Sequence, residues 1–234
     1  MVKNMNNKNQ RLTTGCKTID SILQGGLTKG TITSISGESS TGKTQIAFQT
    51  AMLASNENKR VLFIDTCGTF RPERIISMCK ARKLDHEAIL KKIMVIRINE
   101  FEEQVKIIGQ SIRINRANKF KVLIIDTLTG TLADLSTNIH EANRISAKIA
   151  LHLNDLSHLA SELDIYMLIT NGIRESFRTN DNKSEAGGAA VSQGIHFQVR
   201  LGLDGNETYA ENIYPSFTRK RVNYRIKNEG IVDE

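Results

Sequence analysis

Residues 37–44 read Gly-Glu-Ser-Ser-Thr-Gly-Lys-Thr, which fits the Gly-x-x-x-x-Gly-Lys-Thr pattern of a phosphate-binding loop. Two glycines let the backbone wrap closely enough for its N–H groups to face phosphate oxygens. The pattern predicts that Lys43 reaches the β- and γ-phosphates and that the Thr44 hydroxyl binds Mg²⁺. We therefore expect nucleotide contacts from Gly37, Glu38, Ser39, Ser40, Thr41, Gly42, Lys43, Thr44 and Gln45.

The sequence around this loop fits a nucleotide site. The run Thr31–Ile35 is apolar and β-branched, as expected for a strand, and 44–54 has the pattern of a helix. A loop between them places bound phosphates at a helix N-terminus, where unpaired N–H groups and the helix dipole favour anions. Asp126 fits the same ligand. It ends a later apolar strand, and its carboxylate can hold Mg²⁺ through water.

The composition predicts one α/β domain. The chain has 234 residues, of which 39% are hydrophobic, and no apolar run approaches the roughly 18 residues of a membrane span. Residues 1–12 are expected to be a polar tail and 13–234 a single core. The polar N-terminus resembles no signal peptide, so we expect a cytoplasmic, nucleoid-associated protein without membrane contact.

The cysteines and histidines bear on metal binding, and the charges bear on the kind of partner. The three cysteines and five histidines show no metal-ligand spacing, which favours reduced thiols and ordinary histidines. The net charge is +7, and basic residues gather near both ends of the chain, notably at 219–221. Such clusters suit a polyanion partner, although a solvated lysine-rich face explains them too.

The chain-wide pattern predicts a mostly parallel central sheet with helices on both faces, because short apolar strands alternate with longer helical segments. After residue 195 the pattern changes to alternating strands around an Asp204-Gly205 turn, which indicates an antiparallel C-terminal extension. The polar stretch 171–192 is expected to be a long functional loop. The expected strands are Arg60–Asp65, Ile93–Ile96, Val122–Asp126, Ile165–Ile169, Ile195–Leu203 and Val222–Lys227, and the expected helices are Pro72–Lys83, Leu84–Lys92, Glu100–Asn115 and Glu141–Leu163. The helix 100–115 is expected to bury one apolar stripe formed by Phe101, Val105, Ile108 and Ile112.

Several segments resemble one family in order and spacing. The stretch 63–75, Phe-Ile-Asp-Thr-Cys-Gly-Thr-Phe-Arg-Pro-Glu-Arg-Ile, is similar to the segment after the second core strand of RadA-type recombinases. Residues 42–47, 123–129, 169–171, 186–188 and 224–231 also match, so the resemblance runs from about Thr13 to residue 234. It implies the RecA-like fold of the RecA/RadA superfamily of ATP-dependent DNA recombinases. The N-terminal helix-hairpin-helix domain and the Phe-x-x-Ala polymerisation motif of RadA are missing, a pattern typical of the short archaeal RadB-type paralogues.

The resemblance also implies roles for individual residues. It assigns Lys43 and Thr44 to phosphate and Mg²⁺, Asp126 to Mg²⁺, and Arg74 to stacking on adenine, which suits a planar guanidinium. The segment 172–186 matches the second DNA-binding loop. The candidate DNA contacts are Arg174, Arg178 and Lys183 in that loop and Arg219, Lys220 and Arg221 near the C-terminus, where the basic cluster adds electrostatic attraction.

Two departures from the family concern hydrolysis. Cys67 stands where the family has the glutamate that activates the attacking water, and a thiol is a poor substitute for a carboxylate. Gly172 stands where the family has a glutamine that senses the γ-phosphate. Lys43, Cys67 and Asp126 are the candidate catalytic residues, and Asp65 or Glu38 stays open as a replacement base.

The sequence leaves three readings of function. The first is a recombinase paralogue that binds ATP, Mg²⁺ and single-stranded DNA and acts as a weak DNA-dependent ATPase. It assists a RadA-type recombinase, in short homo- or hetero-oligomers. The second is a nucleotide-dependent switch that does not hydrolyse ATP and regulates or bridges such a recombinase. The third is a KaiC-like or motility-type ATPase of the same superfamily, against which the stretch 69–74 speaks.

Overall fold

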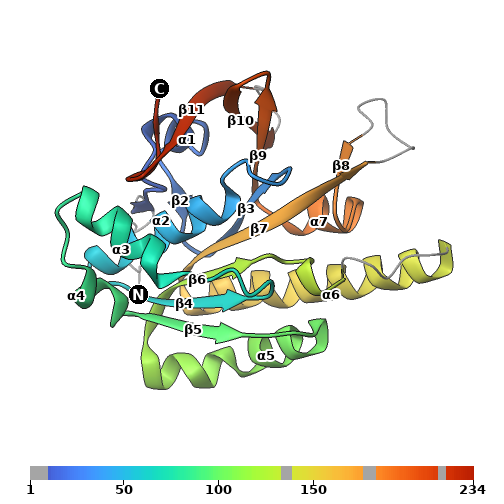
Figure 1. Ribbon diagram of the computed structural model, residues 1–234. Helices are drawn as coiled ribbons and strands as arrows, with labels where there is room; N and C mark the ends of the chain where they lie inside the picture. Colours follow the sequence, from blue (N-terminus) through green and yellow to red (C-terminus); the bar gives the residue numbers. More distant parts are fainter. Residues whose placement is uncertain (1–9, 133–138, 176–182, 216–219) are drawn as a thin grey trace, which may run out of the picture.

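The computed structural model describes residues 10–132, 139–175, 183–215 and 220–234 (Figure 1). Its strands are β1 (Arg11–Leu12), β2 (Leu27–Thr28), β3 (Thr31–Gly37), β4 (Arg60–Asp65), β5 (Ile93–Arg97), β6 (Phe120–Asp126), β7 (Tyr166–Glu175), β8 (Lys183–Glu185), β9 (Phe197–Asp204), β10 (Glu207–Tyr214), β11 (Arg221–Lys227) and β12 (Gly230–Asp233). Its helices are α1 (Lys17–Ile22), α2 (Lys43–Asn56), α3 (Pro72–Ala81), α4 (His86–Leu90), α5 (Phe101–Asn118), α6 (Ile139–Leu163) and α7 (Ala189–Gly194), with a 3-10 helix at Gly130–Leu132.

The central sheet has the strand order β12-β11-β10-β9-β3-β7-β6-β4-β5 within these residues. The pairs from β9 through β3, β7, β6 and β4 to β5 are all parallel. The strands β10, β11 and β12 continue the sheet as antiparallel hairpins, and β8 pairs antiparallel with β7. The expected mostly parallel sheet and its antiparallel C-terminal extension are therefore confirmed.

Helices cover both faces of the sheet because its parallel strands are apolar on both sides. In β4, for example, Val61 and Phe63 face one core, and Leu62 and Ile64 face the other, as the period of two requires. The first core also contains the buried residues of α1, α2, α3 and α4, and the second contains those of α5, α6 and α7. Figure 1 shows α2 and α3 on one side of the sheet and α5 and α6 on the other.

The helix α5 buries a slightly different stripe from the expected one. Phe101 and Ile108 are buried as expected, but the Val105 side chain is 37% exposed. The buried face instead includes Gln104 and Ser111, so it is turned by one residue. A polar contact explains this, because the Gln104 amide lies 2.8 Å from the His152 ring on α6.

The polar stretch 171–192 contains more regular structure than expected. The strand β7 continues to Glu175 and pairs with β8, in a register that sets Ile173 opposite Glu185. Backbone hydrogen bonds hold such a ribbon without an apolar pattern, so periodicity could not reveal it. The hairpin between β11 and β12 was also missed, although Gly230 marks its turn with a φ of 115°.

No helix within the described ranges is long and apolar enough to cross a membrane.

Candidate nucleotide site

Parallel strands bring the candidate site residues to one edge of the sheet. The register pairs Gly37 at the end of β3 with Gly172 on β7. It also pairs Asp65 at the end of β4 with Asp126 at the end of β6. The phosphate loop, the two carboxylates and the turn that holds Cys67 therefore lie around the carboxyl ends of neighbouring strands, where α/β sheets bind their ligands.

The phosphate loop wraps in the expected way at the start of α2. Gly42 has a φ of 94° and forms the N-cap of α2, a left-handed conformation that glycine adopts without strain. A Cβ atom there would also lie only 2.7 Å from the Ile231 side chain. The Thr41 hydroxyl and the Lys43 ammonium both donate to the Glu38 carbonyl, over 2.8 and 2.5 Å. Ser39 and Ser40 are exposed, so the loop opens to solvent.

The hairpin β11–β12 braces this loop from behind. The buried Tyr224 hydroxyl donates to the Thr41 carbonyl over 2.5 Å. The Gln49 side chain, on α2, exchanges two hydrogen bonds with the backbone of Ile231, of 2.9 and 2.8 Å, and donates a third to the Thr14 carbonyl. Sequence reasoning missed this brace. Its one signal in the sequence was a glutamine within the mostly apolar run 46–54.

Asp126 presents an unpaired carboxylate oxygen beside the loop. The residue is 1% exposed, and the Thr170 hydroxyl donates to its Oδ1. Its Oδ2 has no hydrogen-bond partner among the described residues. Burial raises the pKa of Asp126, while the hydroxyls of Thr170 and Thr44 and the charge of Lys43 oppose the shift. A buried carboxylate oxygen without a partner near Thr44 fits Mg²⁺ or a water bound to it, since Mg²⁺ takes few protein carboxylates and completes its shell with waters and phosphates.

Lys43 interacts electrostatically with the same carboxylate. Burial lowers the pKa of Lys43, and the negative charges of Asp126 and Glu38 oppose that shift. The lysine and the aspartate therefore favour each other's charged forms across the loop. The two negative charges favour the protonated Lys43 ammonium, which is the form that binds phosphate oxygens.

Cys67 lies in the turn after β4, close to the end of β6. Its exposed thiol sulfur is 3.9 Å from the Thr127 hydroxyl and 3.6 Å from the Thr66 hydroxyl. The carboxylate of Asp65 accepts the backbone N–H groups of Cys67, Thr69 and Phe70 over 3.1–3.3 Å. Three such bonds hold Asp65 in a structural role, which argues against its use as a replacement base.

Aromatic packing fixes the position of this turn. The Phe70 ring lies 5.4 Å from Phe48 on α2 and 5.0 Å from Phe63 on β4, both in edge-to-face geometry. The turn is therefore anchored to the same core that supports the phosphate loop.

Arg74 lies on α3 and links the start of α2 to the hairpin β11–β12. Its guanidinium donates to the Gln45 side chain over 2.6 Å and to the carbonyls of Lys227 and Asn228 over 2.7 and 2.8 Å. These bonds lie in the guanidinium plane and leave its faces for an aromatic base. The position is compatible with the adenine contact expected of this residue.

Asn171 and Gly172 connect the site to the ribbon β7–β8. The Asn171 amide accepts from the Thr129 hydroxyl and donates to the Ala186 carbonyl, both over 2.7 Å. The Ala186 N–H donates in turn to the Gly172 carbonyl over 2.9 Å. A Cβ atom on Gly172 would meet no atom within 4 Å, so a longer side chain fits there.

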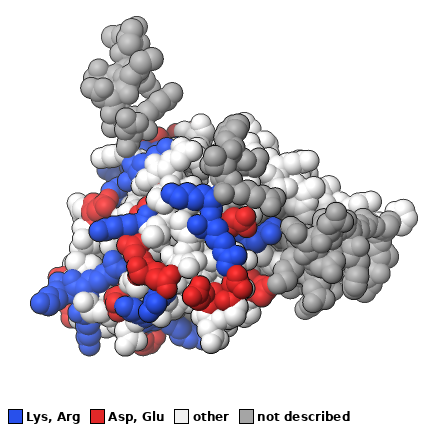
Figure 2. Space-filling view, turned by 90° about the horizontal axis from the view of Figure 1, so that it is seen from above, with Lys and Arg blue, Asp and Glu red and all other residues white. Residues whose placement is uncertain are grey.

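The candidate DNA contacts fall in two places. Arg174 and Lys183 lie on the paired strands β7 and β8, and Arg178 and Arg219 lie outside the described residues. Lys220 is exposed. The Arg221 guanidinium binds the Asp204 carboxylate at 2.7 Å and lies 3.6 Å over the Tyr209 ring. Figure 2 shows basic and acidic side chains interspersed when the molecule is viewed from above Figure 1.

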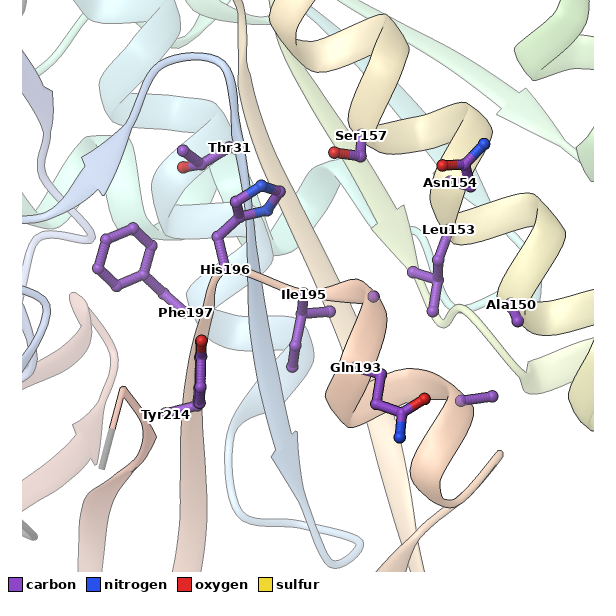
Figure 3. Close-up of a pocket in the computed structure, with 12 residues that line it drawn as sticks. Thr31, Ala150, Leu153, Asn154, Ser157, Gln193, Ile195, His196, Phe197 and Tyr214 are labelled. Carbon is purple, nitrogen blue, oxygen red and sulfur yellow. The ribbon is translucent and has the colours of Figure 1, made fainter. Parts of the chain in front are cut away.

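A separate cavity of about 720 Å³ lies between α6, α7 and the start of β9 (Figure 3). Thr31 lines it at the start of β3, whereas the phosphate loop follows the other end of that strand. The His196 ring also lines it and accepts the Ile32 N–H over 3.2 Å. No charged side chain of the described residues lines this cavity, which distinguishes it from a site for a nucleoside triphosphate.

The fold and the loop define a P-loop α/β nucleotide-binding protein. The chain belongs to the Rad51 family, whose model matches residues 6–234. It is 32% identical over 238 residues to the DNA repair and recombination protein RadA of Metallosphaera sedula, covering 96% of this chain and 72% of that protein. It is 29% identical over 245 residues to RadA of Methanococcus maripaludis, covering 95% and 76%. It is 28% identical over 236 residues to the meiotic recombination protein DMC1 homolog of Arabidopsis thaliana, covering 95% and 68%.

Proposed function

We propose that this chain is an ATP-binding and DNA-binding recombinase paralogue of RadB type, with residues 13–234 acting as one core. It assists homologous recombination and DNA repair beside a RadA-type recombinase and hydrolyses ATP weakly. The relatives named as DNA repair and recombination proteins support the first part. The observation that carries the second part is Cys67, a thiol beside the Asp126 strand end where the family has a carboxylate.

The residues that hold the nucleotide are retained and close together. Lys43 moves from the Glu38 carbonyl to the phosphates, and the loop N–H groups bind their oxygens. Thr44 and the free Oδ2 of Asp126 hold Mg²⁺ or its waters. When bound, Mg²⁺ neutralises charge on the phosphates. Arg74 offers a guanidinium face to adenine.

The residues that activate water are altered. A general base contributes about 10²- to 10⁴-fold to such reactions, and the Cys67 thiol replaces it poorly. Asp65 cannot take over without giving up its three backbone N–H bonds. Gly172 has no side chain to link the γ-phosphate to the ribbon β7–β8. Weak DNA-dependent hydrolysis follows from both changes.

Single-stranded DNA is proposed to bind at the ribbon β7–β8. The proposed contacts are Arg174 and Lys183 on its strands and Arg178 in the segment between them. The C-terminal cations Arg219, Lys220 and Arg221 add long-range attraction, reduced by the ion pair of Arg221 with Asp204. The proposed assemblies are short homo- or hetero-oligomers. The proposed protein partner is a RadA-type recombinase.

The same substitutions also favour a second candidate, a nucleotide-dependent switch that binds ATP without turnover and regulates or bridges the recombinase. Steady-state ATPase rates, measured with and without single-stranded DNA, separate the two candidates when combined with the Kd for a fluorescent ATP analogue. Slow turnover above the rate of a Lys43→Ala control supports the paralogue with residual hydrolysis. Micromolar binding with turnover equal to that control supports the switch, and no binding contradicts both.

The partner requires its own measurement. Purified RadA-type recombinase from the same organism is passed over the immobilised chain with ATP, with ADP and without nucleotide. Retention that depends on nucleotide is expected, and equal background retention in all three conditions contradicts the assignment of this partner.

A further inference from the structure

Six cationic side chains surround one hollow at the edge of the sheet opposite the nucleotide site. The hollow measures about 830 Å³, and nine residues within the described part of the chain line it, none of them acidic. We call its cations the amino-edge cluster: Lys59, Arg60, Lys91, Lys92, Lys119 and Lys121.

The topology brings these residues together from three successive turns. They lie where α2 leads into β4, where α4 leads into β5 and where α5 leads into β6. Because β6, β4 and β5 are adjacent parallel strands, their amino ends meet at one edge. The arrows of β4 and β5 in Figure 1 point away from it. Arg60 begins β4 and Asp65 ends it, so the cluster is about 17–20 Å from the nucleotide side.

Part of the cluster supports the fold. Cations near helix C-termini offset the helix dipole, and two of them bind terminal carbonyls directly. Lys92 donates to the Ser55 carbonyl of α2 over 3.1 Å, and Arg60 donates to the Asn118 carbonyl of α5 over 3.2 Å. Lys59 pairs with Glu57. These contacts account for three of the six cations.

The other three cations bind no carbonyl or carboxylate of the described residues, although Lys91 and Lys119 are the C-caps of α4 and α5, where positive charge offsets the helix dipole. Within the described part of the chain, the side chains of Lys91, Lys119 and Lys121 make no hydrogen bond or ion pair, and all three residues are exposed. Lys119 also has a φ of 52° at the C-cap of α5. Glycine is the residue that suits this left-handed position, so a lysine there makes the helix end less stable. Beyond the helix dipole, no contact within the described residues uses the ammonium groups of these three lysines, so they are free to bind an anionic partner.

The spacing and composition of the cluster point to duplex phosphates. Neighbouring strands are about 4.8 Å apart, so three turns span about 10 Å, over which duplex DNA carries about six phosphate charges. No aromatic residue among those described lines the hollow, whereas sites for single strands combine cations with aromatic side chains that stack on bases. We propose that the amino-edge cluster is a second DNA-binding surface, which holds the backbone of double-stranded DNA independently of its sequence and of bound ATP.

The test compares two triple variants of the full chain. The first is Lys91→Gln/Lys119→Gly/Lys121→Gln. Its matched control, Lys80→Gln/Lys83→Gly/Lys106→Gln, removes the same charge from exposed positions outside the hollow, and Lys83 has a similar φ of 57°. Fluorescence anisotropy gives the Kd for a labelled 20-base-pair duplex and for a single strand of the same length, at several salt concentrations without nucleotide.

The cluster variant should bind the duplex at least tenfold more weakly at low salt than the control does. The slope of log K against log salt should fall by about two to three, as expected for three lost phosphate contacts. Its Kd for a fluorescent ATP analogue should stay unchanged, which separates this proposal from the proposed nucleotide function. Duplex affinity and salt slope equal to those of the control would overturn the proposal. So would an equal loss of single-strand affinity, which would remove the assignment to duplex.

Discussion

The two sides of the nucleotide site are built in different ways. The loop side, 37–45, is braced by buried contacts from β11–β12, including the bond from Tyr224 to the Thr41 carbonyl. The turn side, around Cys67 and Gly172, is anchored by Phe70 and Asp65 but presents a thiol and a bare backbone to the ligand. Under the proposed function, binding and hydrolysis rest on separate elements, and a change on one side should leave the other intact.

Removing the ammonium group tests the loop side most strongly. Lys43→Ala should weaken ATP binding by about 30- to 100-fold, because a hydrogen bond to a charged group contributes about 2–3 kcal/mol. Isothermal titration calorimetry with ATP and Mg²⁺ measures the change. Lys80→Ala, at an exposed lysine on α3, is the control. Equal affinities in the two variants would show that the loop does not hold phosphate in the expected way.

Restoring a carboxylate tests the turn side. Cys67→Glu should raise kcat for ATP hydrolysis at least tenfold, since a well-placed general base contributes about 10²- to 10⁴-fold and an introduced one recovers part of this. The ATP affinity should stay within about twofold, because the loop side is unchanged. Cys67→Gln has nearly the same shape without the basic oxygen, and its rate should remain that of the wild type. A rate for Cys67→Glu no higher than that of Cys67→Gln would mean that this position does not limit hydrolysis.

Removing one hydroxyl tests the brace behind the loop. Burial raises the pKa of Tyr224, so its hydroxyl stays protonated and donates to the Thr41 carbonyl. Tyr224→Phe leaves that carbonyl unsatisfied and should lower the free energy of unfolding by about 1–3 kcal/mol. It should also weaken ATP binding by about five- to tenfold, or 1–1.4 kcal/mol.

The control for the brace is Tyr209→Phe, since the Tyr209 hydroxyl makes no hydrogen bond to the described residues. Chemical denaturation and the Kd for ATP are measured for both variants. If Tyr224→Phe lowers stability but leaves ATP affinity at the control value, the hairpin supports the fold without shaping the loop.

The smallest expected effect is a pH dependence of the free energy of unfolding that arises from Asp126. Burial raises its pKa in the folded protein without nucleotide, so the folded state holds a proton that the unfolded state has released. The free energy of unfolding should therefore fall as pH rises from the ordinary aspartate pKa through the raised one. Asp126→Asn should remove this fall and also abolish the Mg²⁺-dependent part of ATP binding. Parallel unfolding profiles for the two proteins between pH 4 and 7 would contradict the shift.

Local patterns predicted the parallel core well. The continuous apolar strand Val122–Asp126 and the loop 37–44 carry strong signals over short distances, and each lies where periodicity placed it. Contacts between distant segments could not be predicted in this way. Nothing local indicates that Gln49 meets Ile231, or that Gln104 turns the buried face of α5 toward His152.

The candidate site also combines features that a local motif predicts with features that only the folded structure reveals. Its nucleotide residues could be predicted because the loop pattern is continuous in sequence. The commitment of Asp65 to three backbone N–H groups appears only when the turn is folded. The amino-edge cluster escaped notice because its cations are scattered over 59–121, and the strand order alone brings them together.

The brace from β11–β12 also affects the order in which this protein matures on the ribosome. Tyr224 follows Thr41 by 183 residues, and Ile231 follows Gln49 by 182. A nascent chain that has already formed α2 and β3 through β7 still lacks these contacts. The phosphate loop therefore gains this brace only after residues 224–231 have been synthesised, so a nascent chain that ends before them should bind ATP more weakly.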